Sequence, residues 1–158
     1  MSNFVHRNAQ LEDMPAIWAL VKQTAADIPV AVDTSADQER ALSEIMACCA
    51  AELSPVAIDD DKNLVAVVLA KRDLLDWGLF NGGAINVSAI AVAPANRDQG
   101  LVKELLEKLI ARGAPLYVNV RTGETQGVNA ELKSLGFVAA ASDAQGELYK
   151  WEPQAKAA

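Results

Sequence analysis

The residues from Arg97 to Val102 have the types and spacing needed to hold an anion. They follow an apolar run that ends at Pro94, and an amphipathic run begins at Leu101. The first backbone N–H groups of a helix have no partner inside the helix and carry the positive end of its dipole. Gly100 leaves this backbone uncovered, and Arg97 adds a cation. The segment therefore predicts a phosphate-binding loop.

Two side chains of this loop bear on how well it holds a phosphate. Asp98 places a negative charge beside an anionic ligand and opposes Arg97. Its carboxylate has three alternatives: it caps the helix and takes the same N–H groups, it points outward without effect, or it obstructs the ligand. Val102 brings a branched side chain that can crowd a phosphate.

Two regular elements must position this loop. Ala84 to Pro94 is an almost unbroken run of small and β-branched apolar residues, typical of a central strand that is covered on both faces. Leu101 to Arg112 has apolar residues at helical spacing and charged residues opposite them, which predicts an amphipathic helix. The loop thus joins a central strand to a surface helix.

Strand, Val-x-Pro and Arg97-x-x-Gly100-x-Val102 at a helix start resemble the acyl-CoA loop of the GNAT superfamily of N-acetyltransferases. A later Leu135-Gly136-Phe137 helix exit is similar to another landmark of that family. The order of elements is similar from about His6 to Trp151. The resemblance implies an α/β fold, with a GNAT-like central mixed β-sheet flanked by helices on both faces.

The resemblance also implies acetyl-CoA as acyl donor. Main-chain groups of the loop would hold its pyrophosphate, and Ile90 and Val92 would pair with the pantetheine arm where two central strands splay apart. The sequence departs from the family at Val102, where Gly or Ala is usual, and at Gln99, where a cation is frequent. The expected cofactor-binding residues are Ile90, Val92, Arg97, Asp98, Gln99, Gly100, Leu101, Val102 and Thr125.

A catalytic acid is harder to place. Many relatives carry a Tyr before the Leu-Gly-Phe exit, and Leu132 stands there in this chain. Tyr117 and Tyr149 are alternative acids, although each equally suits a packed aromatic side chain. Ser88, on the central strand, is the remaining catalytic candidate. Glu124 fits either an acid/base role or a helix-dipole partner, and His6 fits a strand surface.

The remaining elements follow from periodicity and from turn residues. Trp77 and Phe80 in the irregular connection either line a pocket or pack beneath a loop. The expected strands are Phe4–Arg7, Pro55–Ile58, Leu64–Lys71 and Leu116–Arg121, with a final hairpin of Phe137–Ala141 and Leu148–Trp151. One helix is expected to start near Leu11, a second to run from about Ala36 to Glu52 with Met46 on its buried face, and a third to run from Gly123 to Leu135. The connection Leu74–Gly83 is expected to be irregular.

Composition limits the function classes. The 158 residues carry a net charge of −7 with scattered cations, which argues against nucleic acid or an anionic membrane as partner. Residues 1–153 suit one domain and 154–158 a flexible tail, and neither a leader nor a membrane span is recognised, so we expect the cytoplasm. Cys48 and Cys49 suit helix packing. Asp59 to Asp61 lack the alternating ligands and glycine of a cation loop, so no metal is expected.

The sequence therefore predicts an N-acetyltransferase in which a primary amine of a small molecule or peptide attacks acetyl-CoA directly. The acidic charge favours a cationic amine. The alternative is a GNAT-fold module, catalytically weak or inactive, that binds acyl-CoA or a protein partner. A homodimer is an expectation from the family resemblance.

Overall fold

A computed structural model describes residues 4–72, 84–144 and 146–153. Its centre is a seven-stranded mixed sheet in the order β1-β2-β3-β4-β5-β7-β6, in which β4 and β5 run parallel and the other neighbours antiparallel. This confirms the expected α/β fold. The strands are β1 (Val5–Asn8), β2 (Pro55–Ile58), β3 (Leu64–Arg72), β4 (Ile85–Val92), β5 (Leu116–Arg121), β6 (Val138–Ser142) and β7 (Gly146–Trp151).

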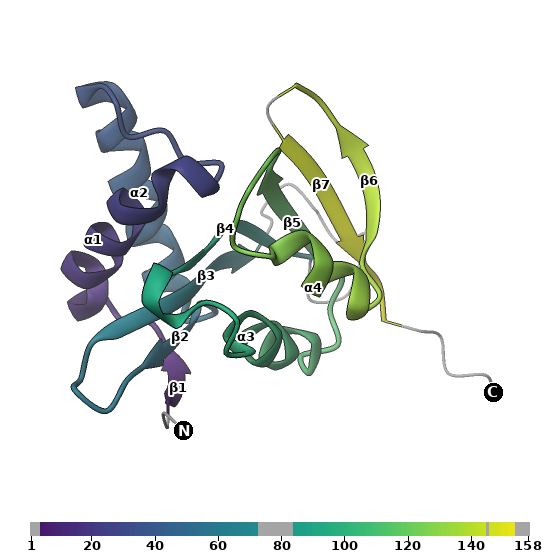
Figure 1. Cartoon of the computed structure of the whole chain (residues 1–158), viewed down its shortest axis with the longest axis horizontal. Helices are drawn as coiled ribbons and strands as arrows, with labels where there is room; N and C mark the ends of the chain where they lie inside the picture. The colour runs from purple at the N-terminus through teal and green to yellow at the C-terminus, as the bar shows by residue number, and fades with distance from the viewer. Residues whose placement is uncertain (1–3, 73–83, 145, 154–158) are drawn as a thin grey trace.

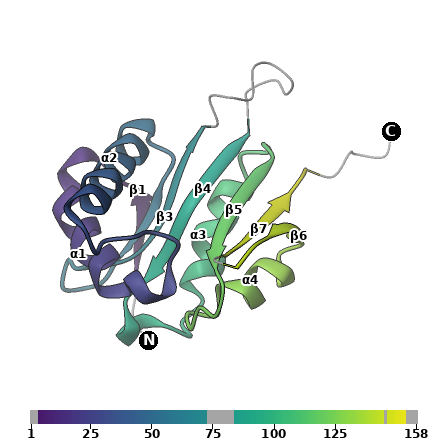
Figure 2. The same ribbon diagram turned by 90° about the horizontal axis from the view of Figure 1, so that it is seen from above.

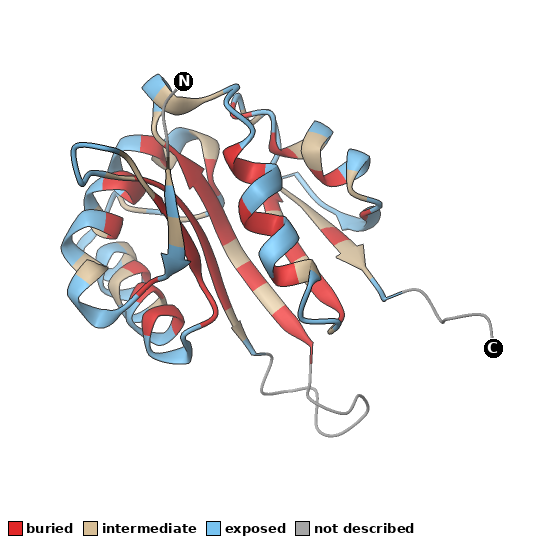
Figure 3. Cartoon of the chain, turned by 90° about the horizontal axis from the view of Figure 1, so that it is seen from below, coloured by how far each residue is buried: buried red, intermediate tan, exposed pale blue. Residues whose placement is uncertain are grey.

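Helices cover both faces of the sheet (Figure 1). On one face lie α1 (Met14–Thr24) and α2 (Ser35–Ala51), and on the other α3 (Leu101–Ile110) and α4 (Val128–Ser134). Each layer encloses its own apolar core, so the central strands are buried on both sides (Figure 3). Short 3₁₀ turns stand at η1 (Leu11–Asp13), η2 (Ala25–Asp27) and η3 (Pro94–Asn96).

The central strand β4 carries an irregularity that prepares the site. Leu69 of β3 pairs with Ala89 and Ala70 pairs with Val87, so Ser88 is an extra, bulged residue. On its other side, β4 pairs with β5 only from Ile85 to Val87. Beyond Val87 the two parallel strands separate, as the view from above shows (Figure 2). The expected splay is therefore present.

Two details of the helices differ from the prediction. The helix expected from Gly123 begins only at Val128, because Gly123 and Gly127 have φ values of +77° and +80°, outside the helical region. Glu124 instead accepts hydrogen bonds from the backbone N–H groups of Gln126 and Asn129 at the helix start, which agrees with the helix-partner alternative of the two roles considered for it. On α2, Met46 was placed on the buried face, but it is 50% exposed.

The other elements agree with their predicted positions within a few residues. Cys48 and Cys49 are buried thiols without a disulfide. Among the described residues, no group of His, Cys, Asp or Glu is arranged to hold a metal ion. The described helices include none with the length and hydrophobicity required to cross a bilayer. Trp77 and Phe80 lie outside the described residues.

Candidate active site

The loop before α3 leaves the first backbone N–H groups of that helix without a side-chain cap. Gly100 is the N-cap with φ +75°, and no described side chain caps this helix. Asp98, for which capping is one alternative, is exposed, and its carboxylate forms no capping hydrogen bond with these N–H groups. Val102 is 6% exposed within the α3-side core, so its branched side chain packs beneath the helix. The geometry fits an anionic group at residues 99–102.

Arg97, in contrast, is bound to the protein itself. Its Nη2 lies 3.1 Å from Asp27 Oδ2, and its Nη1 donates to Thr125 Oγ1 at 3.2 Å. Asp27 Oδ1 also accepts from the backbone N and the hydroxyl of Thr125, at 2.8 and 2.7 Å. One carboxylate in the connection between α1 and α2 therefore joins the loops that precede α3 and α4.

These contacts fix the charge of Asp27. Burial alone raises the pKa of this carboxyl, but hydrogen bonds from Thr125 and the Arg97 guanidinium outweigh burial and leave the pKa below its ordinary value. Asp27 is therefore ionised at neutral pH and attracts Arg97.

The splay between β4 and β5 contains the side chain of Gln126. Its Oε1 accepts from Val92 N at 2.8 Å and its Nε2 donates to Ile90 O at 2.9 Å. Only about 10 Å³ of cavity remains beside it. The main-chain groups expected to bind a pantetheine arm are thus present at the predicted residues, and a side chain of the protein pairs with them.

Asn119 marks the point where the two strands separate. Its Nδ2 donates to Val87 O and to Asn86 Oδ1, both at 3.1 Å. It lines both the small cavity beside Gln126 and a larger pocket of about 920 Å³. The splay and the pocket are therefore neighbours that share residues of β5.

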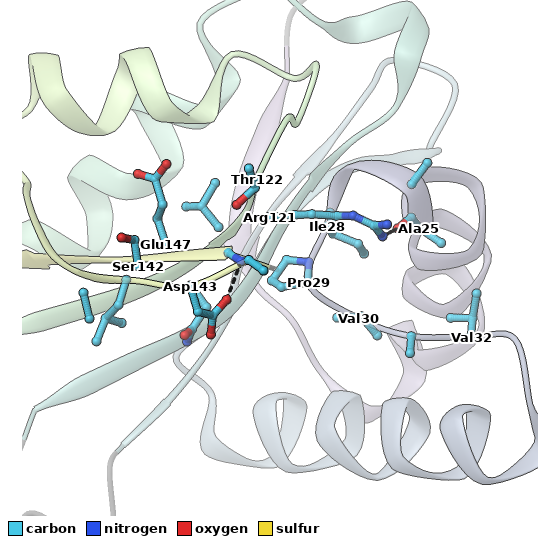
Figure 4. A pocket seen from close by; sticks show the side chains of 18 of the residues that line it. Ala25, Ile28, Pro29, Val30, Val32, Arg121, Thr122, Ser142, Asp143 and Glu147 are labelled. Atoms are coloured by element: carbon cyan, nitrogen blue, oxygen red, sulfur yellow. Dashed lines mark hydrogen bonds between the residues drawn. The ribbon is translucent and has the colours of Figure 1, made fainter.

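The larger pocket lies between the α1–α2 connection, the end of β5 and the β6–β7 hairpin (Figure 4). Arg121 reaches across it and donates to Ala25 O at 2.9 Å. Asp33, Asp143 and Glu147 also line it, so its acidic side chains outnumber this one lining cation. Such a pocket attracts a positively charged ligand.

Ser88, a predicted catalytic candidate, contacts a residue that we did not predict. Its hydroxyl donates to Glu44 Oε1 on α2, and Lys71 Nζ lies 2.7 Å from Glu44 Oε2. Burial raises the pKa of Glu44, but the hydrogen bonds from Lys71 and Ser88 outweigh burial and leave the pKa below its ordinary value. Cys48 Sγ also lies 3.8 Å from this carboxylate, and burial, then Glu44, raises the pKa of Cys48 to about 12.

The two tyrosines differ in placement. Tyr149 is 1% exposed, its hydroxyl donates to Glu147 at 2.8 Å, and burial raises its pKa to about 12. Tyr117 is half-buried, and Lys150 Nζ lies 5.7 Å from its ring centre.

Leu132 is fully buried in the α3-side core. His6 lies on β1, 3.1 Å from Glu104.

Sequence reasoning missed Asp27, Glu44 and Gln126. Each reaches its partners across the fold: Glu44 meets Ser88 from 44 residues away, and Asp27 meets Thr125 from 98. The spacing of residues along the chain carries no signal for such contacts. The only hint of these contacts in the sequence is a polar residue between apolar helix positions, such as Glu44.

Comparisons with known proteins agree with the fold. No family model matches the chain, and no curated protein sequence matches it either. Among solved structures it is similar to arylalkylamine N-acetyltransferase 2 from Aedes aegypti, with TM-score 0.73, 11% identity and coverage of 96% of this chain and 100% of that one.

Two further structures extend this likeness. yncA from Salmonella typhimurium, solved with its cofactor acetyl-CoA, gives TM-score 0.67 and 22% identity, covering 99% of this chain and 98% of that one. The polyamine N-acetyltransferase of Drosophila melanogaster, which forms N-acetylagmatine, gives a TM-score of 0.68 and 15% identity. The match covers 94% of this chain and 98% of that one. The chain therefore has the fold of the GNAT N-acetyltransferases.

Proposed function

We propose that the chain is an N-acetyltransferase that transfers the acetyl group of acetyl-CoA to a primary amine. The observation that carries this proposal is the junction at Asn119, where the splay between β4 and β5 meets the acidic pocket. Both substrates can then be bound at once, which direct transfer requires. The known N-acetyltransferases with this fold support the reaction class.

The residues present fit acetyl-CoA, which supplies an acetyl thioester when it is bound. The uncapped N–H groups at residues 99–102 would hold the pyrophosphate, with Arg97 as the neighbouring cation. Ile90 O and Val92 N would pair with the pantetheine arm once Gln126 has moved. Thr125 borders the loop through its contact with Arg97.

We assign the acceptor to the larger pocket and its class to cationic amines of small molecules or peptides. Asp33, Asp143 and Glu147 surround a volume of about 920 Å³, large enough for a polyamine or an arylalkylamine. The amines named for similar structures, a polyamine and an arylalkylamine, belong to this class.

Ser88 and Glu44 are the proposed proton acceptors. An ammonium proton passes to Ser88 Oγ while the Ser88 proton passes to Glu44 and then to water. The neutral amine nitrogen attacks the thioester carbonyl carbon, and the carbon–sulfur bond breaks. The second amine proton neutralises the departing thiolate, so the products are an amide and a free thiol. The bulge places Ser88 beside the point where β4 and β5 separate.

Release of coenzyme A thiol with a panel of amines tests this function. We expect turnover with diamines and arylalkylamines and little with amino acids, whose carboxylate is repelled by the pocket. Ser88→Ala and Glu44→Gln should each lower kcat about a hundredfold, the usual contribution of acid–base catalysis, with KM for acetyl-CoA unchanged. Glu39→Gln, an exposed carboxylate on the same helix, is the matched control. Full kcat in both variants would remove the pair from the mechanism.

Two observations favour a second function. The fully buried Leu132 stands where relatives carry a Tyr that acts as the catalytic acid, and Gln126 lies in the splay. In this alternative the chain is an acyl-CoA-binding or protein-interaction module. Binding of coenzyme A without turnover of any amine would favour the module, and absence of binding would contradict both the enzyme and the acyl-CoA-binding module.

The setting of the protein is also a proposal. We infer a cytoplasmic protein without nucleic acid or membrane partners from its net charge of −7 and scattered cations. A homodimer is inferred from the family resemblance, and light scattering at micromolar concentration tests it directly.

A further inference from the structure

Gln126 forms hydrogen bonds that a neighbouring strand would otherwise form. Beyond Val87, no strand among the described residues pairs with β4 on its β5 side, and the Gln126 carboxamide bonds Val92 N at 2.8 Å and Ile90 O at 2.9 Å. Gln126 as a whole is 7% exposed. A buried amide with both its donor and its acceptor satisfied is a stable arrangement, and breaking it leaves polar groups without partners.

A set of contacts holds Gln126 in this position. Thr125, the preceding residue, is bound through its backbone and its hydroxyl to Asp27, and Asp27 also pairs with Arg97 at 3.1 Å. The side chains of Arg97 and Asp27 are only 19% and 15% exposed. Gly127, with φ +80°, follows Gln126 and gives the backbone a turn that other residues rarely adopt.

We infer that Gln126 is an internal competitor of the acyl donor and sets its affinity; this inference rests on the proposed function. The pantetheine arm carries amide groups, which have the same donor and acceptor as the Gln126 carboxamide. Both compete for Ile90 and Val92, and the cavity of about 10 Å³ leaves no room for both. A donor therefore binds only after Gln126 has left the splay.

Arg97 connects this competition to the anionic end of the donor. It pairs with Asp27 at 3.1 Å and lies three residues before Gly100, the N-cap of α3. A diphosphate at the uncapped N–H groups of this helix carries more charge than a single carboxylate and draws the guanidinium away from Asp27. Loss of that pair loosens the hold on Thr125, so the anionic end of the donor promotes the release of Gln126.

Calorimetric titration of the full chain with coenzyme A tests the inference. Gln126→Met keeps the side-chain volume but removes both hydrogen bonds, so coenzyme A should bind about tenfold more tightly than to the wild type. Gln23→Met, an exposed glutamine on α1, is the matched control and should bind as the wild type does. Equal or weaker binding by Gln126→Met would overturn the inference while leaving the proposed function intact. If neither protein binds coenzyme A, the proposed function fails.

Exchange of the Val92 amide hydrogen provides a second measurement that does not depend on affinity. In the wild type this amide should exchange slowly without ligand, because Gln126 bonds it. In Gln126→Met it should exchange faster and become slow again when coenzyme A is added. Unchanged exchange in a folded Gln126→Met protein would show that Gln126 does not hold this group and would overturn the inference.

Discussion

Glu44 shows how a single carboxylate can be kept ionised inside a fold. Its two oxygens accept from Ser88 on β4 and from Lys71 on β3, while its own helix supplies Cys48. Burial acts against the charge, and the two stronger donors outweigh it. An ionised, oriented carboxylate can accept a proton through Ser88, and a protonated one cannot.

At this scale, Lys71→Met should move the acid limb of activity. The pKa of Glu44 is depressed in the wild type, so the carboxylate stays ionised at pH values where an ordinary glutamate begins to take up a proton. Without the ammonium, burial raises this pKa, and protonation then begins at higher pH. We expect the acid limb of kcat/KM to shift upward by about one pH unit, an effect of one charged hydrogen bond.

The measurement is a pH profile of kcat/KM for both proteins between pH 4 and pH 8. Lys62→Met, an exposed lysine in the β2–β3 turn, serves as the matched control and should keep the wild-type profile. Coincident acid limbs in wild type and Lys71→Met would show that another group controls the reaction.

At the scale of elements, the irregular β4 is stabilised by its neighbours. Ser54, just before β2, is fully buried, and its hydroxyl accepts from Ala70 N at 2.8 Å and donates to Ala70 O at 2.9 Å. Ala70 borders the β4 bulge. One side chain thus supplies the pairing that β2, which starts at Pro55, does not give to β3.

Ser54→Ala should therefore destabilise the protein by about 2 kcal/mol, because both polar groups of Ala70 lose a buried partner. Chemical denaturation measures the free energy of unfolding. Ser43→Ala, on the exposed face of α2, should change it by less than about 0.5 kcal/mol. Equal stability of the two variants would mean that water replaces the Ser54 hydroxyl.

The elements were largely predictable because their periodicity is local. The β4 strand and α3 followed from an apolar run and an amphipathic run on either side of Gly100, and both are confirmed. The start of α4 was wrong because Gly127 was read as an ordinary helix residue, whereas its positive φ ends the preceding loop. The splay was predicted from the family resemblance, but the side chain that lies in it was not.

At the scale of the whole molecule, the two layers of helices contribute different parts of the proposed site. The α3 side presents uncapped backbone donors for an anion, and the α1–α2 side opens onto a pocket lined by three acidic side chains. In the sheet between them, the pairing of β4 with β5 ends at Val87. Oppositely charged substrates would therefore approach different sides of the splay and meet there.

Asp27 connects these two sides. It belongs to the α1–α2 connection, other residues of which line the larger pocket, and it bonds the loops that precede α3 and α4. Because this contact depends on sequence positions 70 and 98 residues apart, only the complete fold creates it. Under the proposed function, binding of the donor should therefore alter the contacts of Asp27 and, through them, the connection that lines the pocket. Such a coupling suits an enzyme that binds two substrates together.

Hydrogen exchange at single amides, measured with and without saturating coenzyme A, tests most directly whether the donor binds where we place it. We predict slower exchange at Gln99 to Val102, whose N–H groups would take the pyrophosphate, with Val92 protected in both states. Protection confined to another part of the chain, or no change at these amides, would contradict the proposed function.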